Sequence, residues 1–440
     1  MDATVRQYLE LYAEPDAALA ERVGATYQHV LVVPACREAP GFHQGYLAAA
    51  RSAPGRVLCV VIVNGADDAP VAVHRQNGVL LESLTGSARR TLPSEAVWRR
   101  EDDFDLFVVD RASEGRRLPP KQGVGLARKI GTDLALALFA SGAVRDSNLY
   151  GSDADVELPA EYFRAGADVE PSATALLFPF LHAPSGEVEL DRATELYEIL
   201  MRYYVAGLRH ASSPYAYHSV GSACVPRAVA YARARGFPKR LGGEDFHLLS
   251  KLAKLGPLAR VDSNPIRIQT RRSDRVAFGT GPAVARVEAR EQAGLEFTLH
   301  HPGAFEALRA LLVALRSYAA SPHDSAPEEF IAGAASMGEA GQKYVAEAGL
   351  YAELERVRRE CRTEARRIRR LGTWFDALRT LRFVRAVDAT LPELGWPRAL
   401  TLAPFVPSEP QNLSVQAALR GFRSRERHAP PRVGPTLFGA

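Results

Sequence analysis

The run Val57-Leu58-Cys59-Val60-Val61-Ile62-Val63, followed at once by Asn64-Gly65, decides the fold class. An unbroken apolar run that is rich in β-branched residues and ends at a turn signal predicts a strand buried on both faces. Such strands belong mainly to parallel sheets that carry helices on each side. The sequence therefore predicts an α/β fold built around residues 57–63.

Similar apolar runs alternate with helical patterns on both sides of this strand. Towards the N-terminus, residues 1–24 predict an amphipathic helix broken at Pro15, and Val30 to Val33 predict a first strand that stops at Pro34. The other expected elements are helix 41–52, helix 70–88, strand 106–109, helix 124–141 with Gly142 as its cap, strand 148–150, strand 173–181, and helices 189–209, 226–235 and 244–255. This alternation favours a mainly parallel, Rossmann-like sheet, in which ligands bind beyond the carboxyl ends of the strands.

Length and composition limit the class of protein further. With 440 residues, the chain is too long for one ordinary core, and its patterns divide it into segments 1–27, 28–285, 286–400 and 401–440. The second is the α/β domain, the third is helical and rich in charge, and the last is rich in Pro, Gly and Arg. A formal net charge of +4 on so long a chain does not indicate a nucleic-acid partner.

Targeting and cysteine usage favour a cytoplasmic protein. The four cysteines are scattered and have neither the spacing of a zinc site nor that of a disulfide framework. The first residues lack the charged start and apolar core of a signal peptide, and no apolar run approaches the roughly 18 residues of a membrane span.

Three polar segments at the ends of expected strands and at the starts of expected helices carry the chemistry. These are Pro34 to Glu38 after the first strand, Gly123 to Gly131 followed by Asp153-Ala154-Asp155, and Gly242-Gly243-Glu244-Asp245. Two carboxylates that lie two residues apart suit a hard divalent cation, which prefers oxygen ligands. Taken alone, the same pair is more typical of a turn or helix cap.

In this order, the segments resemble glycosyltransferase family 2, which has the GT-A fold. The family pattern is a strand ending in Pro-x-x-x-Glu, a helix start Gly-x-x-x-Ala-Arg-Asn-x-Gly, then Asp-x-Asp and Gly-x-x-Glu-Asp. The resemblance covers about residues 28–270, with Lys129 in place of the common Asn. It implies a nucleotide-sugar donor, with a uridine nucleotide as the family default, and Mn²⁺ or Mg²⁺ held by Asp153 and Asp155.

The resemblance also implies the roles of individual residues. Asp245 is the candidate general base for an acceptor hydroxyl, and Glu244 orients it, binds the acceptor or begins the helix. The candidate donor-nucleotide residues are Pro34, Ala35, Arg37, Glu38, Asn64, Arg128, Lys129 and Asp153. Val63 stands where the family usually has an Asp that reads the base, so base recognition is expected to pass to Asn64 or to backbone groups.

Further segments are candidates for a lid, an acceptor wall and a surface contact. Arg271, Arg272 and Arg275 lie in a Gly-containing stretch that either folds over a diphosphate or forms an ordinary loop. The aromatic loop with Tyr215, Tyr217 and His218 is a candidate acceptor wall, or else an ordinary turn. The arginine-rich helix expected over residues 354–371 either contacts anionic lipid at the inner face of the membrane or another polyanion, or packs on the catalytic domain.

These features predict a metal-dependent, hexosyltransferase-like enzyme that inverts at the transferred sugar and acts on an unidentified hydroxyl acceptor. A retaining GT-A enzyme stays open because no sequence feature sets the stereochemistry. A sugar nucleotidyltransferase is disfavoured, since the loop over residues 35–41 is poor in Gly. A degenerate, non-catalytic GT-A binding module is the third interpretation, supported by Val63.

Overall fold

The computed structural model describes residues 2–86, 90–91, 96–100, 104–273, 279–320, 335–406, 414–429 and 431–434. The chain forms two compact units, Met1–Glu187 with Ser219–Ala283, and Val188–His218 with Val284–Ala440. The first unit ends close to the expected boundary at residue 285, but residues 188–218, which were expected in the α/β domain, belong to the second unit. Helix α5 (Val188–His210) joins the C-terminal helices because its apolar face packs against α9 (Pro302–Ala320) and α16 (Val415–Arg427).

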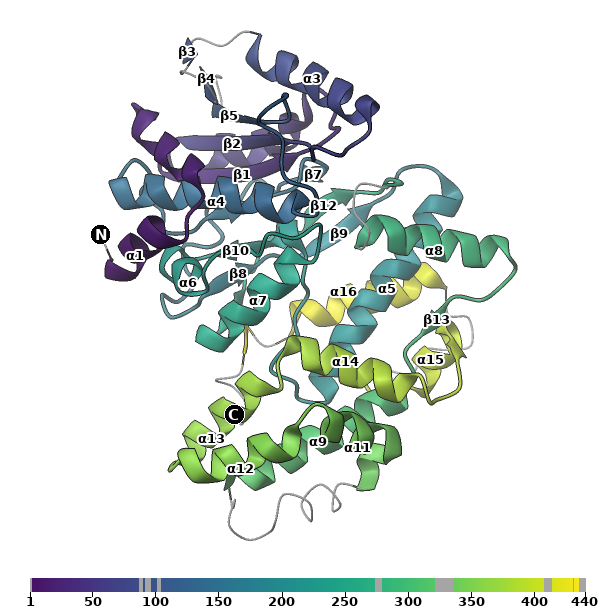
Figure 1. Cartoon of the computed structure of the whole chain (residues 1–440). Coiled ribbons are helices and arrows are strands. Elements are labelled where there is room, and N and C mark those ends of the chain that lie inside the picture. Colours follow the sequence, from purple (N-terminus) through teal and green to yellow (C-terminus); the bar gives the residue numbers. More distant parts are fainter. Residues whose placement is uncertain are drawn as a thin grey trace. The chain divides into compact units, whose positions relative to one another are not determined.

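The first unit is built on a six-stranded sheet in the order β3-β4-β5-β2-β1-β6. Its parallel strands are β1 (His29–Ala35), β2 (Val57–Asn64), β5 (Asp105–Arg111) and β6 (Tyr150–Gly151) (Figure 1). Every residue of β1 and β2 is buried, which confirms the predicted two-sided burial. The antiparallel strands β3 (Arg90–Thr91) and β4 (Ala96–Arg100) add an edge that the sequence patterns did not predict.

The strand order reverses at β1. Strands β2 and β5 extend the sheet on one side of β1, whereas β6 pairs on the other side, with Val32 opposite Gly151. In open α/β sheets, ligands bind at such a switch point, beyond the carboxyl ends of the strands. The segment after β1 and the segment after β6 therefore meet at one place, although more than a hundred residues separate them in the sequence.

Strand β1 continues through Pro34 to Ala35, so the expected stop at Pro34 is wrong. The backbone N–H of Ser152 donates to the carbonyl of Val32 at 3.0 Å, which shows that Val32 points its polar groups towards β6. Pro34, two residues further on, faces the same side, but β6 has already ended there. Because no ladder bond is needed at that position, the missing N–H of Pro34 does not interrupt the strand.

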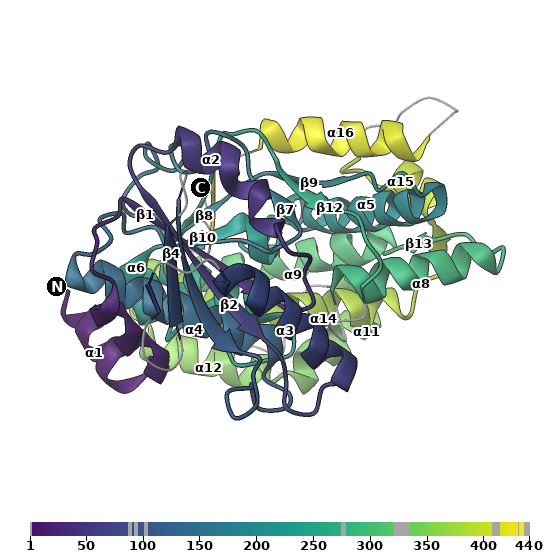
Figure 2. The same cartoon turned by 90° about the horizontal axis from the view of Figure 1, so that it is seen from above.

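Helix α4 (Gly123–Ser141) packs along β1 and β2 (Figure 1, Figure 2). A Cβ on Gly131 would lie 2.3 Å from Cγ1 of Val32, and one on Gly125 would lie 2.5 Å from the carbonyl oxygen of Pro238. Both glycines therefore serve close packing. Gly142 ends the helix in the left-handed region at φ 83°, as predicted.

The other elements of the first unit are helices, which follow the predictions, and short strands, of which those at 156–157, 224–226, 258–260 and 266–269 were not predicted. They are α1 (Ala3–Leu11), η1 (Pro15–Arg22), η2 (Phe42–Tyr46), α2 (Leu47–Ser52), α3 (Val71–Thr85), β7 (Val156–Glu157), β8 (Ala175–Leu177), β9 (Phe180–Ala183), β10 (Cys224–Pro226), α6 (Ala228–Arg233), α7 (Glu244–Leu255), β11 (Leu258–Arg260) and β12 (Ile266–Gln269). The segment predicted as one strand, 173–181, forms both β8 and β9, which pair in different small sheets. The strand expected over 148–150 begins only at Tyr150.

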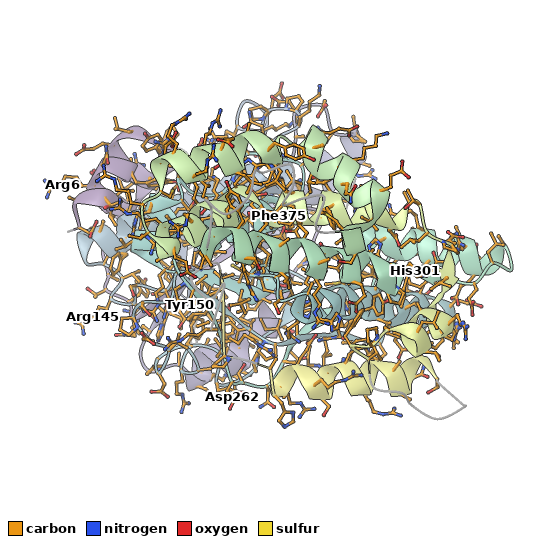
Figure 3. All side chains as sticks on the ribbon, turned by 90° about the horizontal axis from the view of Figure 1, so that it is seen from below. Arg6, Arg145, Tyr150, Asp262, His301 and Phe375 are labelled. Carbon is orange, nitrogen blue, oxygen red and sulfur yellow. The ribbon has the colours of Figure 1, made fainter. Side chains whose placement is uncertain are left out.

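The second unit is helical, as predicted for the C-terminal region. Its remaining elements are α8 (Thr280–Gln292), which begins in the first unit, β13 (Thr298–Leu299), η4 (Ala335–Met337), α11 (Gly338–Glu347), α12 (Leu350–Glu360), α13 (Glu364–Trp374), α14 (Ala377–Asp388), β14 (Leu394–Gly395), α15 (Trp396–Leu402) and β15 (Arg432–Val433). Phe305, Phe375 and Phe383 lie fully buried in its core; Phe375 is labelled in Figure 3. Helix α16 forms within the Pro/Gly/Arg-rich tail.

The arginine-rich segment is two helices, so the single helix expected over 354–371 is wrong. Helix α12 ends before Cys361, and α13 begins after Thr363, whose hydroxyl accepts from the backbone N–H of Arg366. Thr is a good N-cap residue, so a new helix begins after Thr363 instead of α12 continuing through it. Within the described part of the chain, no helix is both long enough and apolar enough to cross a bilayer.

Candidate functional site

The turn that carries Asp153 and Asp155 leaves the carboxyl end of β6 at the switch point. The Tyr46 hydroxyl, from η2, donates to the carbonyl of Asp153 at 2.8 Å, and the Gln269 backbone N–H donates to the carbonyl of Asp155 at 2.8 Å. The side chain of Asp153 is 34% exposed and that of Asp155 is 18% exposed. The turn is thus fixed by its backbone, and both carboxylates remain accessible.

Arg128 joins the Asp153 turn to the Glu244-Asp245 segment. Its Nε donates to Oε1 of Glu244 at 2.8 Å, and its Nη2 forms an ion pair with Asp153. The Arg128 side chain is buried. Burial opposes its charge, but Asp153 and Glu244 outweigh that cost and hold the pKa of the guanidinium above its ordinary value. Through these contacts Arg128 braces the Asp153 turn, whereas its expected contact with the donor nucleotide stays a prediction.

Gly221 closes the space beside this arginine. A Cβ at that position would lie 2.5 Å from Nη2 of Arg128, so any larger residue would displace the guanidinium. Gly221 lies in the short 3-10 helix η3 (Gly221–Ala223), and sequence patterns gave no signal for it.

Arg271 makes a second bridge, from the end of β12 to the loop after β1. Its Nη1 and Nη2 donate to the two oxygens of Glu38 at 2.9 and 3.0 Å, and Nη2 lies 2.6 Å from Oδ2 of Asp155. Glu38 is almost fully buried. Paired donors that face both carboxylate oxygens make this a strong, oriented contact. The two arginines therefore hold the segments after β1, β6 and β12 together with the start of α7.

The cluster carries an excess of negative charge. Five carboxyl groups accompany the two guanidinium groups of Arg128 and Arg271, and these acids are Glu38, Asp153, Asp155, Glu244 and Asp245. An oxygen-only set of this kind fits Mn²⁺ or Mg²⁺. Among the described residues, no group of three or more His, Cys, Asp or Glu side chains is placed to hold a metal. Mg²⁺ usually binds through one or two carboxylates together with phosphate oxygens and waters, so a cation at Asp153 and Asp155 would take further oxygens from a ligand or water.

Asp245 begins α7 and is the group with the most altered acidity in the cluster. Gly243 precedes the helix in the left-handed region at φ 70°, and the Asp245 carboxylate accepts from the Phe246 backbone N–H at 2.7 Å. Burial, followed by the neighbouring charge of Glu244, raises the pKa of Asp245 to about 7. A carboxyl group of that acidity is suited to accept a proton near neutral pH.

The expected nucleoside side of the site is held by two asparagines. Asn64, at the end of β2, donates to the carbonyl of Ala35 at 3.1 Å, and Asn77 of α3 donates to the carbonyl of Asn64 at 2.9 Å. Asn77 also accepts from the backbone N–H of Arg37, which has φ 55°. Pro34, Ala35 and Asn64 are buried, so they shape the loop after β1 from within. Base contact by Asn64 stays a prediction.

Asn77 was missed by sequence reasoning, although the sequence held a signal for it. It is fully buried and lies on the same helical stripe as Leu80 and Leu84. A polar residue on an otherwise apolar stripe must find hydrogen-bond partners inside the protein. Here its partners are the backbone groups that follow β1 and β2.

Lys129 lies in a separate buried network, and the structure gives no support to its predicted phosphate contact. Its amino group donates to Asp133 at 2.7 Å, to the Tyr8 hydroxyl at 2.7 Å and to the Tyr12 carbonyl at 2.8 Å. Successive helical residues point in different directions, so Arg128 faces Asp153 while Lys129 faces α1. All three donors of the ammonium are used: two hold the N-terminal segment on α4 through Tyr8 and Tyr12, and the third goes to Asp133 of α4 itself.

Among the described residues, those predicted for a lid and for an acceptor wall, apart from Arg271, are not among the contacts that define the Asp153 cluster. Arg272 is exposed and pairs with Glu187 at 2.6 Å, and Arg275 lies outside the described residues. Tyr215, Tyr217 and His218 belong to the second unit.

The expected aromatic wall is instead part of the second unit's interior. Tyr215 and Tyr217 are buried, and the Tyr215 hydroxyl donates to the carbonyl of Gly372 at 2.7 Å. His218 Nε2 lies 2.7 Å from Oε1 of Glu426. Because their surfaces pack within the unit, the two tyrosine rings are not presented as an exposed acceptor wall.

Comparisons with known proteins add no assignment, since the chain matches no protein-family model and no curated protein.

Proposed function

We propose that the first unit is a glycosyltransferase that uses a nucleotide-sugar donor. The observation that carries the proposal is the Arg128 bridge, because it brings the Asp153 turn and the Glu244-Asp245 segment into one cluster. The family resemblance implies that these segments are the metal motif and the base motif. Their meeting at the switch point of a parallel sheet places them where such folds bind ligands.

In this proposal Asp153 and Asp155 hold a divalent cation together with the donor diphosphate. The cation, when bound, offsets the negative charge that develops on the leaving nucleotide. Arg271 lies between Glu38 and Asp155 and is close enough to contact the same diphosphate. We propose a uridine nucleotide as the donor and name no particular sugar.

Asp245 takes the proton of the acceptor hydroxyl in this mechanism. The acceptor oxygen then forms its bond to the anomeric carbon as the bond from that carbon to the diphosphate breaks, which inverts the configuration. Glu244 is held by Arg128 at 2.8 Å and keeps the start of α7 in place. Its negative charge also contributes to the raised pKa of Asp245.

A non-catalytic binding module is the second candidate, and one observation favours it. Asp153 and Asp155 are each paired with an arginine, so both carboxylates have a structural role that needs no metal. Val63, fully buried at the end of β2, offers no carboxylate for a base. A retaining enzyme is the further alternative within the same donor chemistry.

The proposal predicts metal-dependent nucleotide binding that requires Asp155. Nucleoside diphosphates and nucleotide-sugars, tested with and without Mn²⁺, should raise the melting temperature of the wild type, since ligands that bind only the native state stabilise it. Asp155→Asn should lose the Mn²⁺-dependent part of the shift. Asp262→Asn is the matched control, because Asp262 is an exposed acid of the same unit (labelled in Figure 3) and should respond like the wild type.

The outcomes separate the candidates. A Mn²⁺-dependent shift with one nucleotide, followed by release of that nucleotide from its sugar, supports the enzyme. Nucleotide binding without any release favours the binding module. The absence of a shift with every nucleotide, with and without Mn²⁺, rules against both.

We also propose that the surface of α12 and α13 makes a peripheral contact with anionic lipid. The exposed arginines of this surface are Arg356, Arg358, Arg359, Arg362, Arg366, Arg369 and Arg370. Among the described residues, Arg362, Arg366 and Arg369 make no ion pair, and no large apolar side chain of α12 or α13 is exposed. The attraction would therefore be electrostatic, on the order of 1 kcal/mol for each arginine near the surface.

This contact predicts salt-sensitive binding to anionic vesicles. Replacing Arg362, Arg366 and Arg369 by Gln should weaken co-sedimentation with phosphatidylserine-containing vesicles about tenfold or more in 0.1 M salt. Phosphatidylcholine vesicles serve as the control and should bind neither protein. Equal sedimentation of the variant and the wild type would rule the contact out.

A further inference from the structure

The second unit contains a cavity of about 380 Å³ between α5 and α16. Its walls combine the aromatic rings of Phe405 and Phe422 with the charged side chains of Arg209 and Glu426. The volume falls in the range of small-molecule sites in proteins, which pair apolar walls with a few polar groups. None of these residues takes part in the proposed transferase chemistry.

Most of the charges around the cavity are explained by the packing of α16 on α5. Arg202 pairs with Glu198 at 2.7 Å and with Glu426, while Arg423 donates to both oxygens of Glu198 at 2.8 and 2.9 Å. Glu198 and Arg202 are buried, and a buried ion pair is tolerated when its groups are hydrogen-bonded in this way. These residues need no ligand to account for them.

Arg209 is not part of that network. Glu426, the described acid whose charge acts on Arg209, gives one oxygen to Arg202 and the other to His218, at 2.7 Å for the latter. Within the described residues, the guanidinium of Arg209 therefore makes no hydrogen bond or ion pair of its own. Burial lowers the pKa of Arg209, and the charge of Glu426 offsets this only in part. A half-buried cation without a partner is costly unless a ligand supplies the missing anion.

We propose that this cavity binds a small organic anion, whose phosphate or carboxylate pairs with Arg209 and whose aromatic or apolar part packs against Phe405 and Phe422. Arg425, which lies over the Phe422 ring at 5.1 Å from its centroid, adds positive charge at the same wall. A free inorganic anion would leave the two rings unused. The site does not depend on the transferase assignment, because every group in it belongs to the second unit.

Phenyl phosphate and benzoate are suitable probes, and calorimetric titration of the full chain measures their binding. The wild type is expected to bind phenyl phosphate at least fivefold more tightly than inorganic phosphate. Arg209→Gln should weaken phenyl phosphate binding about tenfold or more, because a charge-assisted hydrogen bond is lost. Arg398→Gln is the matched control, an exposed arginine on α15 outside the cavity, and should bind as the wild type does.

A second variant tests the volume of the cavity independently of its charge. Ala206 lines the cavity, and Ala206→Leu should fill part of it and weaken both probes while leaving Arg209 in place. Circular dichroism and thermal unfolding of each variant show that it is folded.

Phenyl phosphate binding that is unchanged in Arg209→Gln and in Ala206→Leu would overturn the proposal, because the probe would then occupy another site, such as the expected diphosphate site of the first unit. Lack of measurable binding of either probe to the wild type at 10 mM would also overturn it. Inorganic phosphate binding as tightly as phenyl phosphate would refute the role of the two rings.

Discussion

Asp245→Asn is expected to lose transferase activity while becoming more stable than the wild type at pH 8. The carboxyl group is enclosed at the start of α7, and burial together with the charge of Glu244 raises its pKa from 3.8 to about 7. The folded protein therefore keeps a proton on Asp245 between about pH 4 and pH 7 that the unfolded chain has lost. Through this window the group contributes less and less to stability as the pH rises.

In the Asp245→Asn variant, the side chain loses its negative charge but keeps nearly the same shape. Its side-chain oxygen can still accept from the Phe246 backbone N–H, which the carboxylate contacts at 2.7 Å. A pKa change of about three units corresponds to roughly 4 kcal/mol, so a gain on the order of 2–4 kcal/mol is expected at pH 8 and little or none at pH 4. Loss of a general base typically lowers the rate 10²–10⁴-fold.

Urea unfolding at pH 4, 6 and 8, with nucleotide release from the donor as the activity measurement, tests both halves of this expectation. Asp262→Asn, the exposed control, should change neither quantity. A variant that is less stable than the wild type at pH 8 would contradict the buried-charge account. A variant with full activity would remove Asp245 from the mechanism, whatever its stability.

The fold could be predicted where local patterns decide it. The apolar run at 57–63 and the helix at 244–255 appear with almost the expected bounds, because burial on two faces and helical periodicity are both visible in a short window. The break at Pro15 and the cap at Gly142 follow from single residues with restricted or unusual backbone preferences. Each of these signals lies within a few residues of the feature that it determines.

The features of the fold and of the site that could not be predicted depend on contacts between distant parts of the chain. Whether Pro34 ends β1 depends on where β6 stops, and the sequence near Pro34 contains no trace of that. The pairing of Arg271 with Glu38 joins residues 233 positions apart. A pattern of residue types could nominate both side chains, as it did, but it could not reveal that one holds the other. Tyr8 and Tyr12, which accept from the Lys129 ammonium, were missed for the same reason.

The carboxylates that the sequence nominated lie in one cluster, and the arginines explain how they can do so. Asp153, Asp155, Glu38 and Glu244 would repel one another in a small volume if no cation lay between them. Arg128 and Arg271 supply two of the positive charges. The shape of the site is therefore inseparable from its electrostatics, and removing an arginine should affect folding as well as ligand binding.

Arg128→Gln is expected to destabilise the protein by about 3–5 kcal/mol, because it leaves the buried carboxylate of Glu244 without its partner. Arg267→Gln is the matched control: Arg267 pairs with Glu157 at 3.2 Å, but both side chains are about half exposed or more, so its loss should cost less than about 1 kcal/mol. The double variant Arg128→Gln/Glu244→Gln should recover much of the loss, since the unpaired charge is removed with its partner. Equilibrium urea unfolding of these three variants and of Glu244→Gln alone measures these differences. If Arg128→Gln were as mild as Arg267→Gln, or if the two substitutions were additive, the ion pair would not be what holds α7 against the Asp153 turn.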